Sequence, residues 1–120
     1  MPKFPVIHAD CDEVIPLFMN LSLACDFRIV AANTIFMKPY FKLETLPKGG
    51  GAFFLCKMLR YSTAKQLLMS ENNISAMEAY EMGIVDQVVP YIQLEEEAHK
   101  IARDFSKRSL RSLEGIKRLI

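Results

Sequence analysis

The sequence contains no apolar run that approaches the roughly 20 residues a helix needs to cross a bilayer. Its longest run, at residues 52–55, is far too short, and residues 1–5 lack the apolar segment of a secretory signal. The three cysteines, Cys11, Cys25 and Cys56, are odd in number and widely spaced, and no Cys-x-x-Cys pair occurs. A disulfide framework is therefore not expected, and we predict a cytoplasmic protein with reduced thiols.

An excess of one charge is also missing. The 15 basic and 14 acidic residues give a net charge of +1, so the whole chain shows no bias toward nucleic acid. Residues 100–120 are less balanced, because seven basic side chains there are opposed only by Asp104 and Glu114. This pattern is typical of the solvated face of a terminal helix, and an anion-binding patch is the alternative.

The composition indicates one folded domain. Apolar residues make up 51% of the chain and charged residues 24%, which excludes intrinsic disorder. The length of 120 residues allows a single domain, residues 1–120.

The first half of the chain alternates between extended and helical patterns. Residues 4–9 and 27–32 are predicted strands, and residues 34–37 form a third, shorter one. Between the first two, Pro16 suits the first turn of a helix over residues 17–24. His8, Asp10 and Asp12 alternate, so an extended strand would place them on one face. Such residues are common where a strand enters a turn, and we expect no metal site.

The second half is more regular and mostly helical. Two capping boxes, residues 63–66 and 75–78, predict helix starts, and Gly83 suits the end of the second helix. Residues 84–89 read as an extended segment. A longer helix from Leu94 carries apolar residues at positions 98, 101, 102 and 105, and a last helix spans residues 110–120. Neither terminal helix has much sequence left to cover its apolar stripe, which favours self-association.

A run of glycines precedes the first of these helices. Gly49, Gly50 and Gly51 lead into an apolar segment, and the free N–H groups of such a helix start can hold an anion or an oxyanion. The run lacks the ending of a P-loop and the spacing of a dinucleotide fingerprint. A plain loop is therefore the alternative reading.

Four segments, taken in order, resemble the crotonase family of enoyl-CoA hydratases and isomerases. Residues 21–30, LSLACDFRIV, resemble the family's LALACDFRIA, and residues 43–51, LETLPKGGG, resemble LGLIPGGGG. Residues 74–90 are similar to ISAEEAYEWGLVNRVVP, and residues 5–7 resemble the strand in KPVIAAVNG. The resemblance covers nearly the whole chain but only the family's C-terminal part, so we expect a fragment or a natural truncation.

The resemblance implies an α/β fold. Residues 1–90 would form part of the family's ββα superhelix, and residues 91–120 a helical region through which the chain forms trimers or hexamers. The family's first half supplies one of two oxyanion-hole N–H groups and much of the coenzyme A pocket. The implied ligand is an acyl-coenzyme A, with its thioester as part of the substrate and no separate cofactor.

The family's functional positions can be carried over one by one. Leu17 stands where the second oxyanion-hole glycine stands, and Asn20 stands at the first catalytic glutamate. In the family segment FGQPE the second glutamate follows proline, and Tyr40 stands there in this chain. The Gly49–Gly51 segment would contribute to substrate binding. An amide cannot act as a base at neutral pH, and a phenol with a pKa of about 10 is a poor one.

These replacements leave two functions open. One is an acyl-CoA-handling protein of lyase or isomerase descent in fatty acid metabolism, impaired in hydratase chemistry. The other is a noncatalytic pseudoenzyme or assembly subunit of an acyl-CoA enzyme complex. A nucleic-acid binder that uses the basic C-terminal residues is the least favoured reading, because no interleaved aromatic platform accompanies them.

Overall fold

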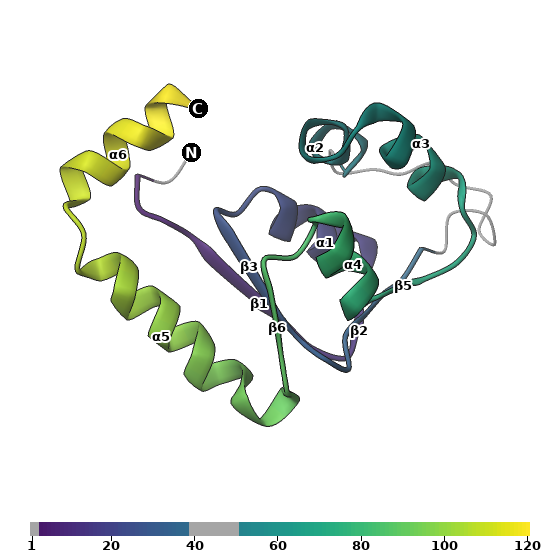
Figure 1. Ribbon diagram of the computed structural model, residues 1–120, viewed down its shortest axis with the longest axis horizontal. Helices are drawn as coiled ribbons and strands as arrows, with labels where there is room; N and C mark the ends of the chain where they lie inside the picture. The colour runs from purple at the N-terminus through teal and green to yellow at the C-terminus, as the bar shows by residue number, and fades with distance from the viewer. Residues whose placement is uncertain (1–2, 39–50) are drawn as a thin grey trace.

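The computed structural model describes residues 3–38 and 51–120, and its chain runs through two small sheets with helices around them (Figure 1). The first sheet holds three parallel strands in the order β1 (Ile7–Asp10), β3 (Phe27–Ala31) and β6 (Gln87–Val89). Ile7 pairs with Phe27, and Ile29 with Gln87. Because parallel strands need crossover connections, segments far apart in sequence meet in this sheet.

The second sheet also has three strands, but its strand directions are mixed. In it β2 (Glu13–Val14) runs parallel to β4 (Ile35–Phe36), and β5 (Ile74–Ser75) pairs antiparallel with β4. The chain thus passes from a strand of the first sheet to one of the second and then into helix α1 (Pro16–Leu23), before a second pair of strands follows. This strand–strand–helix order confirms the α/β superhelix that the sequence predicts.

Besides α1 and α4 (Ala76–Met82), the described chain contains four further α-helices and a short 3₁₀ turn. They are α2 (Gly51–Met58), α3 (Tyr61–Met69), η1 (Tyr91–Gln93), α5 (Leu94–Ser106) and α6 (Leu110–Leu119). In Figure 1 the pair α2 and α3 lies on the opposite side of the sheets from α5 and α6. The core lies between the sheets and helices α1 to α4, and its largest fully buried side chains include Phe36, Ile84 and Val30.

Helix α4 (Ala76–Met82) begins and ends where the sequence predicts. The Ser75 hydroxyl accepts the Glu78 N–H at 3.1 Å, and the Glu78 carboxylate accepts the Ser75 N–H at 3.3 Å. Gly83 ends the helix with φ of 89°, a left-handed conformation that favours glycine. The N–H groups of Ile84 and Val85 then both donate to the Ala79 carbonyl. The strand expected from residue 84 consequently starts only at Gln87.

One local prediction is wrong. The capping box expected at residues 63–66 is absent, because α3 begins at Tyr61 after Arg60 and no side chain caps it. The fully buried Ala64 donates its N–H to the Arg60 carbonyl, so Thr63 lies inside the helix. Residues 13–14 form strand β2 directly after Asp12, whose φ of 58° is left-handed.

Helix α5 lies along the first sheet, and neither α5 nor α6 buries any residue fully. Phe105 of α5 meets Phe27 of β3 edge to face, with ring centroids 6.5 Å apart. Helix α6 is fastened by Lys117, whose ammonium donates to the Phe4 carbonyl at 3.0 Å and to the Asp26 carboxylate at 2.8 Å. Within the described ranges, no helix is long and apolar enough to cross a bilayer.

Candidate functional site

Helix α1 carries two of the positions that the family resemblance singles out. Leu17 lies in its first turn, directly after Pro16, which has no N–H, so the backbone N–H of Leu17 is the first of the helix. The next two N–H groups, of Phe18 and Met19, donate to the Ile15 carbonyl at 3.1 and 3.2 Å. N–H groups at a helix start point outward with a partial positive charge, and they can stabilise a developing oxyanion.

Asn20 lies one turn further along the same helix and is 7% exposed. Its neighbours Met19 and Leu23 are also buried, so this side of α1 faces the core. A buried amide can donate and accept hydrogen bonds, but it carries no charge and takes up no proton at neutral pH. At this position the chain can therefore orient a polar group, whereas it cannot act as a general base.

The other predicted site residues are only partly covered by the structure. Gly51 is the first residue of α2, as expected for a glycine run that opens a helix. Helix α2 packs against α1, so the two helices that carry candidate positions are neighbours. Tyr40, Gly49 and Gly50 lie outside the described residues.

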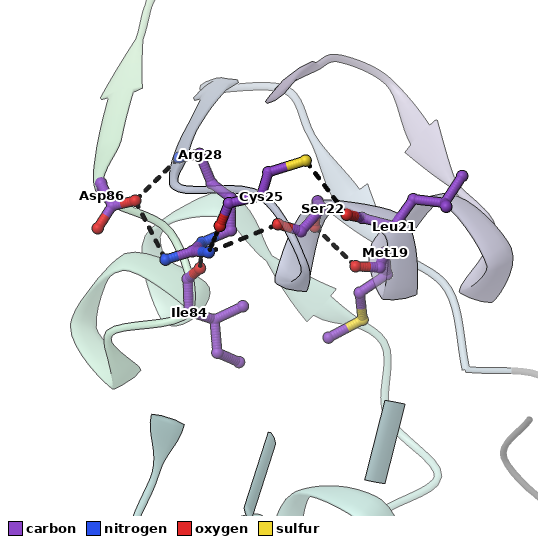
Figure 2. Close-up of polar contacts among 7 residues, drawn as sticks. All are labelled: Met19, Leu21, Ser22, Cys25, Arg28, Ile84 and Asp86. Atoms are coloured by element: carbon purple, nitrogen blue, oxygen red, sulfur yellow. Dashed lines mark hydrogen bonds and ion pairs between the residues drawn. The ribbon is translucent and has the colours of Figure 1, made fainter. Parts of the chain in front are cut away.

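Arg28 fixes the far end of α1, and the sequence patterns alone do not reveal this role. Figure 2 shows its guanidinium reaching from β3 to the carbonyls after α1 and to the segment that follows α4. The guanidinium donates to the Cys25 carbonyl at 2.9 Å and to the Ile84 carbonyl at 2.7 Å, and it pairs with the Asp86 carboxylate at 3.3 Å. The partners are up to 58 residues away along the chain, which explains why a local pattern does not predict them.

A buried lysine is the second feature that the sequence patterns miss. Lys38 is 7% exposed, and its ammonium donates to the Leu67 carbonyl at 2.6 Å and to the Ser70 carbonyl at 3.0 Å, at the end of α3. Burial lowers the pKa of Lys38 below its usual range, and the Glu78 carboxylate partly opposes that shift. The signal was present in the alternation of β4, because Lys38 follows the buried Phe36 by two residues.

A cavity of about 240 Å³ adjoins this lysine. Its wall comes from α3, the turn before β5, and α4; it includes the polar residues Thr63, Gln66, Asn72, Asn73 and Glu78 beside the apolar Leu67, Ile74 and Met82. The Asn73 side chain accepts the Lys38 N–H at 3.0 Å. Lys38, which follows β4, is therefore held both by its backbone N–H and by its side chain.

The three alternating residues near the N-terminus do not form one group. His8 Nε2 lies 2.8 Å from the Asp10 carboxylate. Asp12 instead accepts a hydrogen bond from the Asn33 amide at 2.7 Å. Among the described residues, no cluster of three or more His, Cys, Asp or Glu side chains could hold a metal ion.

Comparison with known proteins finds a matching family and several sequence relatives. The sequence model of the family described as enoyl-CoA hydratase/isomerase matches residues 18–119. The crotonyl-CoA hydratase of Syntrophomonas wolfei is 41% identical over 92 residues, which are 76% of this chain and 35% of that protein. The carnitinyl-CoA dehydratase of Salmonella typhi is 32% identical over 100 residues, which are 83% of this chain and 38% of that protein.

A solved structure agrees with the sequence relatives. That of enoyl-CoA hydratase subunit I from Geobacillus kaustophilus superposes with a TM-score of 0.90 at 29% identity, over 97% of this chain and 45% of that one. The chain therefore spans less than half the length of each of these proteins.

Proposed function

Because the chain belongs to the enoyl-CoA hydratase/isomerase family, we propose that it handles acyl-coenzyme A thioesters and does not hydrate them. The observation that carries this proposal is Asn20, a buried amide on α1 at the position that the family resemblance assigns to the first catalytic glutamate. The resemblance assigns the second glutamate to position 40, which is a tyrosine. Hydration needs groups that position water and exchange a proton, and neither residue is a carboxylate.

The part of the chemistry that α1 retains is a backbone donor. A leucine at position 17 still offers its N–H at the helix start, where a thioester oxygen would gain negative charge. Polarising that carbonyl favours an enolate, the intermediate of isomerisation and decarboxylation. The start of α2 at Gly51, next to α1, is the place where we propose that the pantetheine or phosphate portion of the ligand binds.

A noncatalytic subunit of an acyl-CoA enzyme complex is the alternative, and the exposed faces of the last two helices favour it. Ile116 is 53% exposed and Leu119 87%, and no residue of α5 or α6 is fully buried. Apolar patches of several hundred Å² are rare on monomers. We propose self-association through these helices, into trimers or hexamers, in the cytoplasm. Sedimentation at micromolar concentration would show the assembly, and a well-folded monomer would contradict it.

Titration calorimetry with butyryl-CoA tests the ligand. Butyryl-CoA is saturated and cannot be hydrated, so the heat reports binding alone. We expect weak binding that weakens further as salt is raised, because phosphate contacts with exposed groups are screened. ATP at the same concentration is the matched control. Equal binding of both ligands would indicate that the basic C-terminal residues bind phosphate and that the acyl group is not recognised. No binding of butyryl-CoA would favour the noncatalytic subunit.

A further inference from the structure

The Arg28 guanidinium makes several bonds at the C-terminal end of α1. Its side chain is 11% exposed. Besides the contacts with Cys25, Ile84 and Asp86 given above, it lies 3.5 Å from the Ser22 carbonyl (Figure 2). A guanidinium carries five N–H donors in a rigid plane, so several bonds made at once fix its orientation as well as its position.

Arg28 is itself held at its backbone. Its N–H donates to the Asp86 carboxylate at 2.9 Å, and its carbonyl accepts the Asp86 N–H, also at 2.9 Å. These bonds extend the pairing of β3 with β6, two strands of the first sheet. Because the guanidinium also bonds to the Cys25 carbonyl, it ties the end of α1 to the first sheet.

The last turn of α1 has its carbonyls occupied. The Ser22 hydroxyl donates to the Met19 carbonyl at 2.7 Å, and the Cys25 thiol donates to the Leu21 carbonyl at 3.3 Å (Figure 2). Arg28 adds a positive charge where the helix dipole is negative. No local side chain caps the start of this helix. These bonds attach the C-terminal end of α1 to the residues that follow it and to β3.

Among the side chains of α1 that the structure describes, those on one side are buried and those on the other are half-exposed. Met19, Asn20 and Leu23 are buried, whereas Phe18 is 49% exposed and Leu21 51%. A helix buried on one side can rotate or slide on its apolar face unless directional bonds fix it. Arg28 supplies such bonds.

We propose that Arg28 is the positioning residue of the candidate site: by fixing the C-terminal end of α1, it sets where Leu17 and Asn20 lie. This inference rests on the proposed function for the meaning of those two positions. Eight helical residues span about 12 Å, so a tilt of about 5° about the fixed end displaces Leu17 by about 1 Å. A misplacement of that size can cost about 100-fold in a step that depends on orientation.

The test compares Arg28→Lys, which keeps the positive charge but loses the planar set of N–H donors, with Lys117→Gln as a matched control. Lys117 also takes part in a half-buried ion pair, but its bonds go to Phe4 and Asp26 and hold α6. Asp86→Asn serves as the second variant, because it keeps Arg28 in place and weakens its anchor. Global stability of each protein is measured by urea unfolding and used to normalise the other readouts.

The first readout needs no ligand. After normalisation, amide hydrogen exchange in Phe18, Met19 and Asn20 should speed up at least tenfold in Arg28→Lys. It should rise less in Asp86→Asn and stay within twofold in Lys117→Gln. Exchange in α3 should stay within twofold in all three. Unchanged exchange in α1, or an equal rise in both helices, would overturn the proposal.

The second readout is the thioester carbonyl stretch of bound butyryl-CoA, measured by difference infrared spectroscopy. Wild type and Lys117→Gln should lower its frequency by the same amount. In Arg28→Lys that shift should fall by half or more, with the dissociation constant changed less than threefold. A full shift in Arg28→Lys would contradict the positioning role. Failure of wild type to bind butyryl-CoA would instead defeat the proposed function, and the exchange result would still decide the role of Arg28.

Discussion

Replacing Lys38 with methionine removes a buried ammonium and keeps a side chain of similar length. The ammonium donates to the carbonyls of Leu67 and Ser70 at the end of α3. Hydrogen bonds to a charged group each contribute about 1.5–3 kcal/mol, and an unsatisfied carbonyl costs about 1–3 kcal/mol. Two circumstances reduce the loss. The Leu67 carbonyl also accepts the Ser70 N–H, and the adjoining cavity of about 240 Å³ gives water access to the Ser70 carbonyl.

We therefore expect Lys38→Met to lower the free energy of unfolding by about 2 kcal/mol at pH 7. Urea unfolding followed by circular dichroism measures the difference. Lys65→Met, an exposed lysine on α3, removes the same charge without a buried contact and should change stability by less than about 0.5 kcal/mol.

The pH dependence of that difference tests the cause. Burial lowers the pKa of Lys38 in the folded protein, whereas the unfolded chain titrates near 10.4. Between these two pKa values the unfolded state binds more protons, so wild-type stability rises with pH relative to Lys38→Met. The difference in free energy of unfolding between wild type and Lys38→Met should widen as pH approaches 10. A gap that narrows would mean that the folded protein holds the ammonium more tightly than water does, and the burial argument would be wrong.

Two further predictions concern local structure and thiol chemistry. Ser75→Ala removes one half of the α4 capping box and should lower the free energy of unfolding by about 1 kcal/mol, whereas Ser62→Ala, at an exposed position in α3, should cost less than about 0.5 kcal/mol. Urea unfolding checks both, and equal effects would show that the cap contributes nothing. Burial and the neighbouring Asp26 raise the pKa of Cys25, and burial with Asp12 raises that of Cys11, whereas Cys56 is exposed. A maleimide-type reagent at pH 7.5 should therefore label Cys56 first, as mass spectrometry would show, and faster labelling of Cys25 would contradict its shielding.

The features that sequence predicts best here are those whose causes are local. The capping box at Ser75 and the helix end at Gly83 need only neighbouring residues, and both occur as expected. The same pattern at Thr63 predicts a cap that does not form. There the burial of Ala64 extends the helix past it, and burial depends on segments distant in sequence. Propensity decides an end only where packing allows it.

The candidate site, too, is only partly predictable from the sequence. The resemblance assigns Leu17 and Asn20 to one helix, and the structure shows that helix where the pattern predicts it. The attachment of that helix by Arg28 depends on Asp86 across the first sheet, a pairing that no window of the sequence contains. The burial of Lys38 could be predicted from its alternation with Phe36. Its hydrogen-bond acceptors at the end of α3 could not.

The loss of crotonyl-CoA absorbance tests most directly whether this chain handles acyl-CoA without hydrating it. Purified protein is incubated with crotonyl-CoA beside an enoyl-CoA hydratase of the same family that has both glutamates. The absence of a positioned general acid or base typically costs about 10²–10⁴-fold, and in the proposed assignment Asn20 and Tyr40 take the positions of both catalytic carboxylates. We expect a rate indistinguishable from buffer under conditions in which butyryl-CoA binds. Sustained turnover by the wild-type chain would contradict the assignment of these two positions and the function proposed from them.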